Sequence, residues 1–399
     1  MSRKLRTRVS AKVPTALTVS IVLPCLNEAA TVGKCVKEAK RWLERKRGEV
    51  IVVDNGSSDE SIAVAKKAGA RVVTESKRGY GAAIYRGLVA AKGEYIIIAD
   101  SDLSYDLRHL TPFLKKLQAG ADLVIGNRFK GGVQKGAMPW LHYYIGNPIL
   151  TWTANLFFGT HLGDYHSGIR ALRKSVVKSL NLQCVGMEFA SEMIVRAALL
   201  HLNIQEVPVV YRKDGRKRKS HIRTFRDGWR HLRFLMLFAP NWIFFFPALI
   251  ILILSLAVLI FMVLESLELG HISLGIHTML VLGALLNIGY QLFHWSLCID
   301  VFAKRIHLPV QSPPVVGRFD RTNLEVMMLL GGAICTVGLI FCSWTLLLWS
   351  KQGFGDLNPE STMRVFIPGI TFVILGIQVF FSTLFLGILN FEHIHKSSS

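Results

Sequence analysis

Four long apolar segments in the second half of the chain constrain its fold more than any other feature. They cover about residues 242–264, 274–298, 326–349 and 366–389. A helix needs about 20 apolar residues to cross a bilayer, and each segment reaches that length. The sequence therefore predicts a multi-pass membrane protein with a domain of four transmembrane helices over residues 241–392.

The residues before position 240 have a different composition, because they hold most of the positive charge. The chain carries 47 Lys and Arg against 27 Asp and Glu, a net charge of +20. Ten of these cations lie in residues 212–233, directly ahead of the first apolar segment. From residue 222 onward this stretch also has the apolar spacing of an amphipathic helix. It favours an anionic membrane and phosphate ligands as partners and argues against nucleic acid.

Charges near the ends of the apolar segments predict the orientation of the protein. Glu265 and Glu268 follow the first segment without a cation, whereas Lys304 and Arg305 follow the second. Because cytoplasmic loops carry an excess of Lys and Arg, we expect both termini and the N-terminal domain in the cytoplasm, at the inner or plasma membrane. The expected order is a basic tail over 1–17, a folded domain over 18–211, a basic amphipathic segment over 212–240, and the membrane domain.

Strand-like and helix-like segments alternate from residue 19 to residue 127. Strands are expected at about 19–23, 50–53, 71–74 and 95–99, and helices at about 30–45, 61–68 and 81–91. Such alternation is typical of an α/β domain with a doubly wound, mainly parallel sheet.

Polar residues follow three of the expected strands. Asn27 comes after the first strand, Asp54 after the second, and Asp100 and Asp102 after the fourth. Ligands of open α/β sheets bind at the carboxyl ends of the strands, so these loops are expected to converge. Two carboxylates spaced i, i+2 can share one divalent cation that substrate phosphates also hold. This pattern predicts a nucleoside diphosphate as ligand.

The start of the third expected helix is a further phosphate candidate. Lys77 precedes Gly79 and Gly81 there, and a helix start with glycines beside a cation suits a diphosphate. The chain lacks a Walker loop, and its first strand is not followed by Gly-x-Gly-x-x-Gly, which argues against a dinucleotide oxidoreductase. For Ser58 and Asp59, an ordinary turn before a capped helix is the better interpretation.

These motifs together carry a family resemblance. The order Pro24-x-x-Asn27-Glu28, Asp54-x-Gly56-Ser57-x-Asp59, Gly79-x-Gly81 and Asp100-x-Asp102 resembles that of family-two glycosyltransferases with the GT-A fold. Within that family the chain is most similar to polyprenyl-phosphate glycosyltransferases related to dolichol-phosphate mannose and glucose synthases. The resemblance covers about residues 19–238 and, more loosely, the membrane region.

The resemblance implies a nucleotide-sugar site and a divalent metal. Asp100 and Asp102 would hold the donor diphosphate through Mg²⁺ or Mn²⁺. Ser104, the third candidate metal ligand, stands where mannose synthases often carry a glutamine, and this departure weakens the case for mannose. The expected donor-site residues are Pro24, Leu26, Asn27, Glu28, Asp54, Gly56, Lys77, Gly79, Gly81 and Asp100.

The resemblance also implies an acceptor site. Residues 126–132 are similar to the family's acceptor-side loop, and residues 164–170 to its phosphate-binding motif. Arg128, Ser167 and Arg170 are therefore expected at the acceptor phosphate, because guanidinium groups match phosphate oxygens in pairs. We add Arg212 and Lys219 from the basic segment. For Arg128, a solvated loop arginine is the alternative.

Three further polar residues complete the candidate site. The resemblance places Glu188 near the donor sugar, whereas Glu192 has pairing with a nearby arginine as an equal alternative. His166 is interpreted as a turn residue. The residues expected to act in the reaction are Asp102, Arg128, Ser167, Arg170 and Glu188.

Membership of this family would imply metal-dependent, inverting transfer of one hexose, either glucose or mannose. The donor would be of the UDP-glucose or GDP-mannose type, and the acceptor undecaprenyl or dolichyl phosphate at the cytoplasmic face. The Gln-x-x-Arg-Trp motif of processive synthases is missing. Two alternatives are transfer to another membrane lipid, such as diacylglycerol or ceramide, and a non-catalytic scaffold that binds a nucleotide sugar. The sequence leaves a homo-oligomer open.

Overall fold

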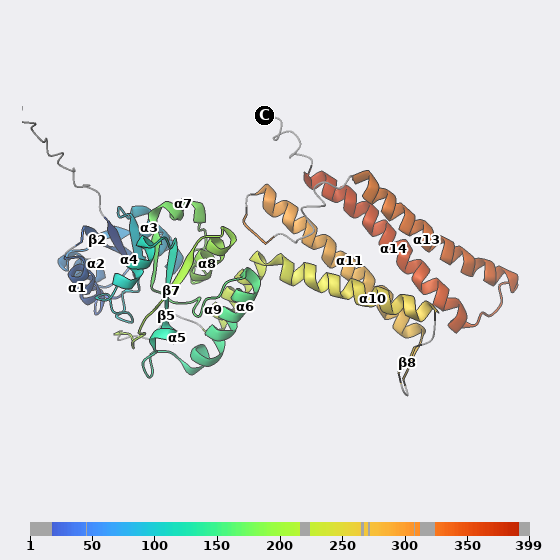
Figure 1. Cartoon of the computed structure of the whole chain (residues 1–399), viewed down its shortest axis with the longest axis horizontal. Helices are drawn as coiled ribbons and strands as arrows, with labels where there is room; N and C mark the ends of the chain where they lie inside the picture. Colours follow the sequence, from blue (N-terminus) through green and yellow to red (C-terminus); the bar gives the residue numbers. More distant parts are fainter. Residues whose placement is uncertain are drawn as a thin grey trace, which may run out of the picture. The chain divides into compact units, whose positions relative to one another are not determined.

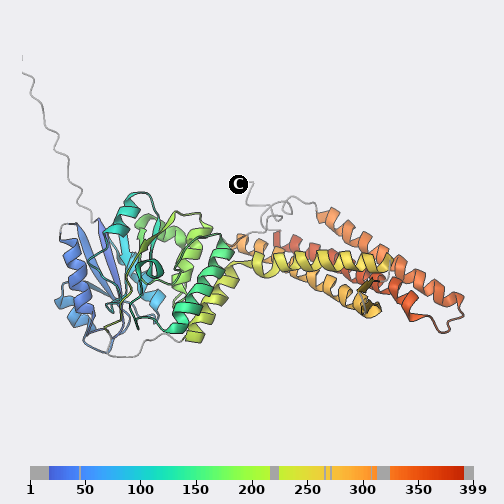
Figure 2. The same cartoon turned by 60° about the horizontal axis from the view of Figure 1, so that its bottom comes forward.

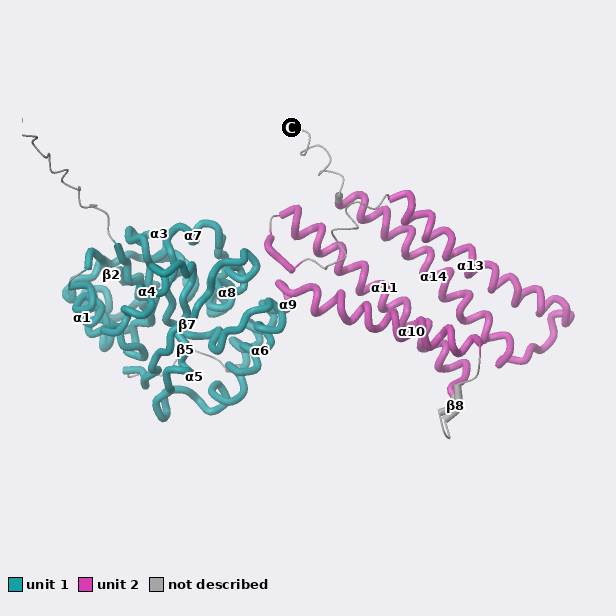
Figure 3. The backbone as a smooth tube through the Cα atoms, in the orientation of Figure 1, with its two compact units in different colours: residues 1–235 teal, residues 236–399 magenta. Residues whose placement is uncertain are grey.

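The structure, a computed structural model, describes residues 18–44, 46–215, 224–264, 267–269, 272–306, 308–311 and 324–390. It divides into two compact units, Met1–Leu235 and Met236–Ser399 (Figure 3). The sequence places the change of composition at about residue 240. The expected tail 1–17 and the most basic part of the segment 212–240, with Lys219, lie outside the described residues.

Unit 1 is an α/β domain with helices on both faces of a sheet (Figure 1). The sheet has seven strands in the order β3-β2-β1-β4-β6-β5-β7. Only β6 runs antiparallel to its neighbours β4 and β5, so the predicted mainly parallel sheet is confirmed. The strands are β1 (Val19–Cys25), β2 (Gly48–Asp54), β3 (Arg71–Thr74), β4 (Tyr95–Ile98), β5 (Leu123–Asn127), β6 (Arg170–Arg173) and β7 (Ile204–Pro208).

The helices of unit 1 lie in the connections between the strands, apart from α9, which follows β7 and ends within unit 2. They are α1 (Val32–Leu43), α2 (Ser61–Lys67), α3 (Tyr80–Ala90), α4 (Thr111–Gln118), α5 (Arg128–Gly131), η1 (His142–Gly146), α6 (Asn147–Phe158), α7 (Lys174–Leu180), α8 (Phe189–Leu199) and α9 (Thr224–Phe238).

Side-chain alternation along β1 explains how the sheet is covered. Successive side chains of a strand point to opposite faces. Ile21 and Leu23 are fully buried in a core shared with α1 and α4. Val22 points to the other face, where Gly87 of α3 lies so close that a Cβ there would come within 2.3 Å of the Val22 Cγ1. Packing on both faces therefore holds the strand ends that carry the candidate site.

The described part of unit 2 contains four helices long and apolar enough to cross a membrane, as predicted. The candidate spans are Asn241–Leu264, Ile276–Arg305, Leu324–Lys351 and Pro359–Leu389. The first joins η2 (Asn241–Phe245) to α10 (Phe246–Leu264), and the others are α11 (Ile276–Arg305), α13 (Leu324–Lys351) and α14 (Pro359–Asn390). A short antiparallel pair, β8 (Leu267–Leu269) and β9 (Ile272–Leu274), lies between α10 and α11.

Candidate active site

The loops after β1 and β2 are tied to each other by hydrogen bonds. Asp54 is 3% exposed, and its carboxylate accepts from the backbone N–H of Gly56 at 3.0 Å and of Ser57 at 3.2 Å. The Asn27 side-chain oxygen accepts from the N–H of Ser58 at 2.7 Å, across to the second loop. Asn27 has φ of 57°, a left-handed backbone that asparagine tolerates better than most residues. The predicted convergence of these two loops is present in the structure.

The β1 loop also contacts the loop that carries the two aspartates. The Ser101 hydroxyl donates to the carbonyl oxygen of Pro24 at 2.7 Å. Glu28 is buried, its N–H donates to the Ser61 hydroxyl at 2.8 Å, and its carboxylate accepts from Thr31 at 3.1 Å. Three strand ends thus form one edge, as expected for an open α/β sheet.

The glycines at the start of α3 have a packing role. A Cβ at Gly79 would lie 2.1 Å from the carbonyl oxygen of Val185, and the Gly81 N–H donates to that oxygen at 2.9 Å. The Gly79 N–H donates to the Asn55 side chain at 2.7 Å. Because these donors already have partners within the protein, the expected diphosphate contact of this helix start depends mainly on the exposed Lys77.

Asp100 and Asp102 follow β4 and differ in their surroundings. Asp100 is half-buried and accepts from the Tyr80 hydroxyl at 3.0 Å. Burial and the Asp100 charge raise the pKa of Tyr80 well above its ordinary value, so Tyr80 stays a donor. Asp102 is 4% exposed and accepts from both the N–H and the hydroxyl of Ser104, at 3.0 and 2.5 Å.

The two aspartates fit a hard divalent cation. Carboxylate oxygens are the ligands that Mg²⁺ and Mn²⁺ prefer, and with few protein ligands such ions take the remaining ligands from phosphates and water. Among the described residues no cluster of three or more His, Cys, Asp or Glu could hold a metal, so a cation here would need donor phosphates. The fully buried Ser104 donates its hydroxyl to Asp102, a geometry that supports a carboxylate better than it supplies a direct ligand.

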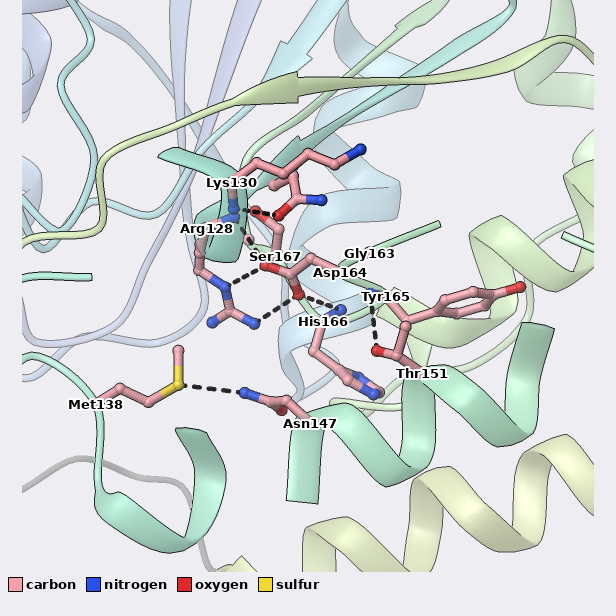
Figure 4. Close-up of polar contacts among 12 residues, drawn as sticks. Arg128, Lys130, Met138, Asn147, Thr151, Gly163, Asp164, Tyr165, His166 and Ser167 are labelled. Atoms are coloured by element: carbon pink, nitrogen blue, oxygen red, sulfur yellow. Dashed lines mark hydrogen bonds and ion pairs between the residues drawn. The ribbon is translucent and has the colours of Figure 1, made fainter. Parts of the chain in front are cut away.

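Arg128 forms a buried ion pair with Asp164 (Figure 4). Its Nε and Nη2 donate to the two carboxylate oxygens at 2.6 and 2.8 Å, and its backbone N–H donates at 3.1 Å. Burial opposes the charge, but Asp164 outweighs this and raises the pKa of Arg128. Arg128 is 7% exposed, so the alternative of a solvated loop arginine is wrong. The pair joins residues 126–132 to residues 164–170.

Arg170 is held by main-chain carbonyl groups. Its Nε donates to Ser167 and its Nη2 to Tyr165, both at 2.9 Å, while its Nη1 donates to Ala190. The side chain is 3% exposed, and burial lowers the pKa of the guanidinium. The guanidinium group of Arg170 is therefore buried under the backbone of residues 164–170 and fixes the shape of this segment.

Ser167 and Gly168 bring the acceptor-side segment to the aspartates. The Ser167 hydroxyl lies 3.4 Å from the Tyr105 hydroxyl, which also accepts from the Gly168 N–H at 2.9 Å. A Cβ at Gly168 would lie 2.1 Å from Asp100 Oδ2, so any other residue at this position would displace that carboxylate. The structure thus brings together the segments predicted for the donor metal and for the acceptor phosphate.

The two glutamates near the start of α8 have different environments. Glu192 is buried and accepts from the N–H of Gln183 at 2.9 Å and from Arg196 at 2.9 Å. The structure thus gives Glu192 the arginine partner that the alternative interpretation expected. Glu188 precedes the helix, and its buried Oε2 has no hydrogen-bond partner within the part of the chain that the structure describes. A buried carboxylate oxygen without a donor is costly, and a ligand hydroxyl would relieve that cost.

A histidine pair was missed from the sequence. The rings of His166 and His231 of α9 lie 4.7 Å apart, edge to face, and the His231 Nδ1 is 2.8 Å from the Ser191 hydroxyl. Burial lowers the pKa of His166 well below its ordinary value and that of His231 to about 4, so both rings are neutral. The spacing of Asp227 and His231 on α9 was a signal for a buried histidine. Residues four apart share a helix side, and this side lies away from the exposed Phe225.

Residues 212–215 run along the metal-candidate loop. The Arg212 N–H donates to the Ser104 carbonyl at 2.9 Å, and the Gly215 N–H donates to that of Asp102 at 2.8 Å. The Arg212 guanidinium pairs with Asp106 at 2.5 Å. Arg108 and, after it, Arg212 hold the pKa of Asp106 well below its usual range. The expected acceptor contact of Arg212 remains a prediction.

Two protein-family models agree with this architecture. Residues 20–180 match the family model for glycosyl transferase family 2, and residues 297–390 match that for the glycosyltransferase family 2 C-terminal transmembrane region. Among solved structures, glucosyl-3-phosphoglycerate synthase from Mycobacterium tuberculosis with phosphoglyceric acid aligns at a TM-score of 0.46 and 23% identity, over 55% of this chain and 79% of that one.

Two relatives from Haloferax volcanii are similar in sequence. The low-salt glycan biosynthesis hexosyltransferase Agl6 is 33% identical over 393 residues, which are 96% of this chain and 91% of Agl6. A dolichyl-phosphate hexose transferase is 30% identical over 196 residues, which are 49% of this chain and 83% of that protein. The similarity to Agl6 spans both units. The chain therefore belongs to glycosyl transferase family 2, as a membrane glycosyltransferase in which the transmembrane helices follow the GT-A domain.

Proposed function

We propose that the protein transfers a single hexose, glucose or mannose, from a nucleotide sugar to a polyprenyl phosphate. One observation carries the proposal: Gly168 of the acceptor-side segment lies directly against the carboxylate of Asp100, the candidate donor-metal ligand. A site for joining two phosphate-bearing substrates needs this juxtaposition. The names of a hexosyltransferase and of a dolichyl-phosphate hexose transferase among the relatives support the same substrate classes.

The residues of the site suit positioning more than proton transfer. A phosphate monoester has a second pKa of about 6, so at neutral pH its oxygen is already ionised and can attack the sugar directly. Arg128 and Arg170 hold the acceptor-side segment, and Ser167 lies within it as a hydroxyl candidate for the phosphate. A single displacement from the face opposite the leaving diphosphate would invert the anomeric carbon. Bound Mg²⁺ or Mn²⁺ would stabilise the charge of that diphosphate.

The orientation of the protein follows from its charges. Lys304 and Arg305 lie in the last turn of α11, on the end expected to face the cytoplasm. With one crossing per candidate span, unit 1 and both termini would share that side. The donor and the acceptor headgroup would therefore meet at the cytoplasmic face.

The proposal is tested by an acceptor panel with the purified full chain. Labelled UDP-glucose and GDP-mannose are offered with undecaprenyl phosphate, dolichyl phosphate, the matching polyprenols, diacylglycerol or ceramide. Labelled lipid should form with the polyprenyl phosphates and one of the two donors, and not with the polyprenols. Efficient labelling of diacylglycerol, ceramide or a polyprenol would overturn the proposal.

The Glu188 Oε2, which has no hydrogen-bond partner among the described residues, supports the alternative of a hydroxyl-bearing lipid acceptor. Such an acceptor must lose a proton as it attacks, and a buried carboxylate is a suitable base. Under the main proposal, Glu188→Gln lowers the rate but keeps the fall of activity below about pH 6, which reflects the acceptor phosphate itself. If the variant instead loses the acidic limb of the pH profile, Glu188 is the base and the alternative is correct.

A further inference from the structure

Residues 138–163 form a surface element without acidic side chains, lysine or arginine. This stretch contains η1 and α6 but no Asp, Glu, Lys or Arg. A surface helix that faces water normally carries charged and polar residues on its outer side. The outer side of η1 and α6 is therefore not built for contact with water.

Six exposed side chains of this element are large and apolar. They recur at steps of three or four residues, apart from the neighbours Tyr144 and Ile145, and so gather on one side of the helix. We call this set the aromatic face: Trp140, Tyr144, Ile145, Ile149, Trp152 and Leu156, which are 66%, 62%, 38%, 54%, 65% and 41% exposed. The opposite side, with Thr151, Ala154 and Phe158, is buried in unit 1. The helix thus presents large apolar side chains on its outer side, where an ordinary surface helix carries polar ones.

The first half of α9 continues this surface. Figures 1 and 2 show α6 and the start of α9 side by side. On α9, Phe225 is 83% exposed and Trp229 56% exposed, and the side chains of Arg226 and Arg230 are about half exposed. An exposed apolar patch of this extent, with cations at its border, marks a contact site.

A bilayer is the partner that fits this chemistry. Trp and Tyr are enriched at the membrane–water interface, where the ring is buried and its polar atom stays hydrated. The first candidate span begins at Asn241, directly after α9 ends at Phe238, so the chain itself tethers unit 1 to a membrane. We propose that the aromatic face inserts into the interfacial layer of the bilayer, as a docking surface that adds apolar contacts to the charge contacts of the basic segment 212–233.

The two surfaces would respond differently to salt. Attraction between basic residues and anionic lipid is screened when the ionic strength rises. Insertion of the aromatic face rests on buried apolar area, which salt does not screen. The aromatic face should therefore stay in the bilayer at ~1 M salt, where the Debye length is about 3 Å.

Site-specific photo-crosslinking tests this inference in the full chain. Benzoylphenylalanine replaces Trp152, and the matched control replaces Lys37, an exposed residue of α1. The protein is placed in vesicles of phosphatidylcholine and phosphatidylglycerol and irradiated at low and at high salt. The prediction is a lipid adduct at position 152, equal at both salt levels, and none at position 37. This readout needs no sugar transfer, so it is independent of the proposed function.

A second measurement gives the depth of the face. Nitroxide labels at Ile149→Cys and Lys37→Cys, in a variant without the six native cysteines, are relaxed by oxygen or by a water-soluble nickel complex. Relaxation by oxygen should exceed relaxation by the nickel complex at position 149, and the reverse should hold at position 37. Nickel dominance at both positions would overturn the proposal, as would crosslinks from position 152 to a second copy of the chain instead of lipid.

Discussion

Ser104 illustrates how a serine can support a candidate metal ligand without being a ligand itself. Its hydroxyl and its N–H both donate to one oxygen of Asp102, which fixes the direction in which the other oxygen points. A hydrogen bond that orients a ligand is a known way to tune metal affinity. The sequence interpretation took Ser104 as a ligand, and the geometry favours a supporting role.

This difference leads to a graded prediction. Asp102→Asn should lower transfer by more than about 100-fold, because the ion is worth several kcal/mol to the departing diphosphate. Ser104→Ala should weaken Mn²⁺ binding in the presence of UDP by about 10–100-fold while some activity remains at high Mn²⁺. Titration calorimetry and rates at several Mn²⁺ concentrations check both. Full activity of the wild type in EDTA would contradict the metal site.

The histidine pair predicts a pH dependence of stability. Burial lowers the pKa of His231 to about 4, so the folded protein stays unprotonated there while the unfolded chain binds a proton below about pH 6.5. Stability should therefore fall between pH 6.5 and about 4, by up to about 1.4 kcal/mol per pH unit for this group. His231→Asn should flatten part of the fall in melting temperature, and His161→Asn, at an exposed position, should not. Equal pH profiles for all three proteins would refute this role.

Elements with a clear local period were predictable. Residues 19–127 alternate between strand and helix patterns, and β1 to β4 lie within two residues of the expected starts. The apolar spans were predictable for the same reason, because length and composition suffice to identify them. The membrane-like character of η1 and α6 was missed, because 26 residues of mixed apolar and small polar type resemble a buried helix until exposure is known.

Long-range pairings were not predictable from one sequence. That Arg128 pairs with Asp164, and that three carbonyl groups hold Arg170, depends on how distant segments meet. The residue types and their motif predicted that these residues lie in one region. They did not predict which groups each side chain contacts. The acceptor-phosphate roles of Arg128, Ser167 and Arg170 remain predictions.

The contact between α13 and α14 allows a test at the scale of helices. A Cβ at Gly338 would come within 2.5 Å of the Val373 backbone nitrogen, whereas one at Gly332 would meet nothing within 4 Å. Small residues let transmembrane helices approach closely. Gly338→Ala should therefore lower the melting temperature in detergent, and Gly332→Ala should leave it unchanged. Similar effects of the two changes would show that this approach does not stabilise unit 2.

For the whole molecule, the charge pattern predicts the topology. Arg305 and Asp356 are both exposed; Arg305 ends the second candidate span, and Asp356 follows the third. In a cysteine-free variant, Asp356→Cys should react with a membrane-impermeant maleimide in intact cells, and Arg305→Cys only after lysis. The reverse pattern would place unit 1 outside the cytoplasm and remove its access to nucleotide sugars.

The most direct test of the central proposal is the structure of the lipid product. The purified full chain is incubated with Mn²⁺, the preferred nucleotide sugar and undecaprenyl phosphate, and the lipid is examined by mass spectrometry and NMR. The account predicts one hexosyl residue added to an intact lipid phosphate, with the anomeric configuration inverted relative to the donor. Several hexosyl residues per lipid, a retained configuration, or a sugar attached to a lipid hydroxyl would contradict it.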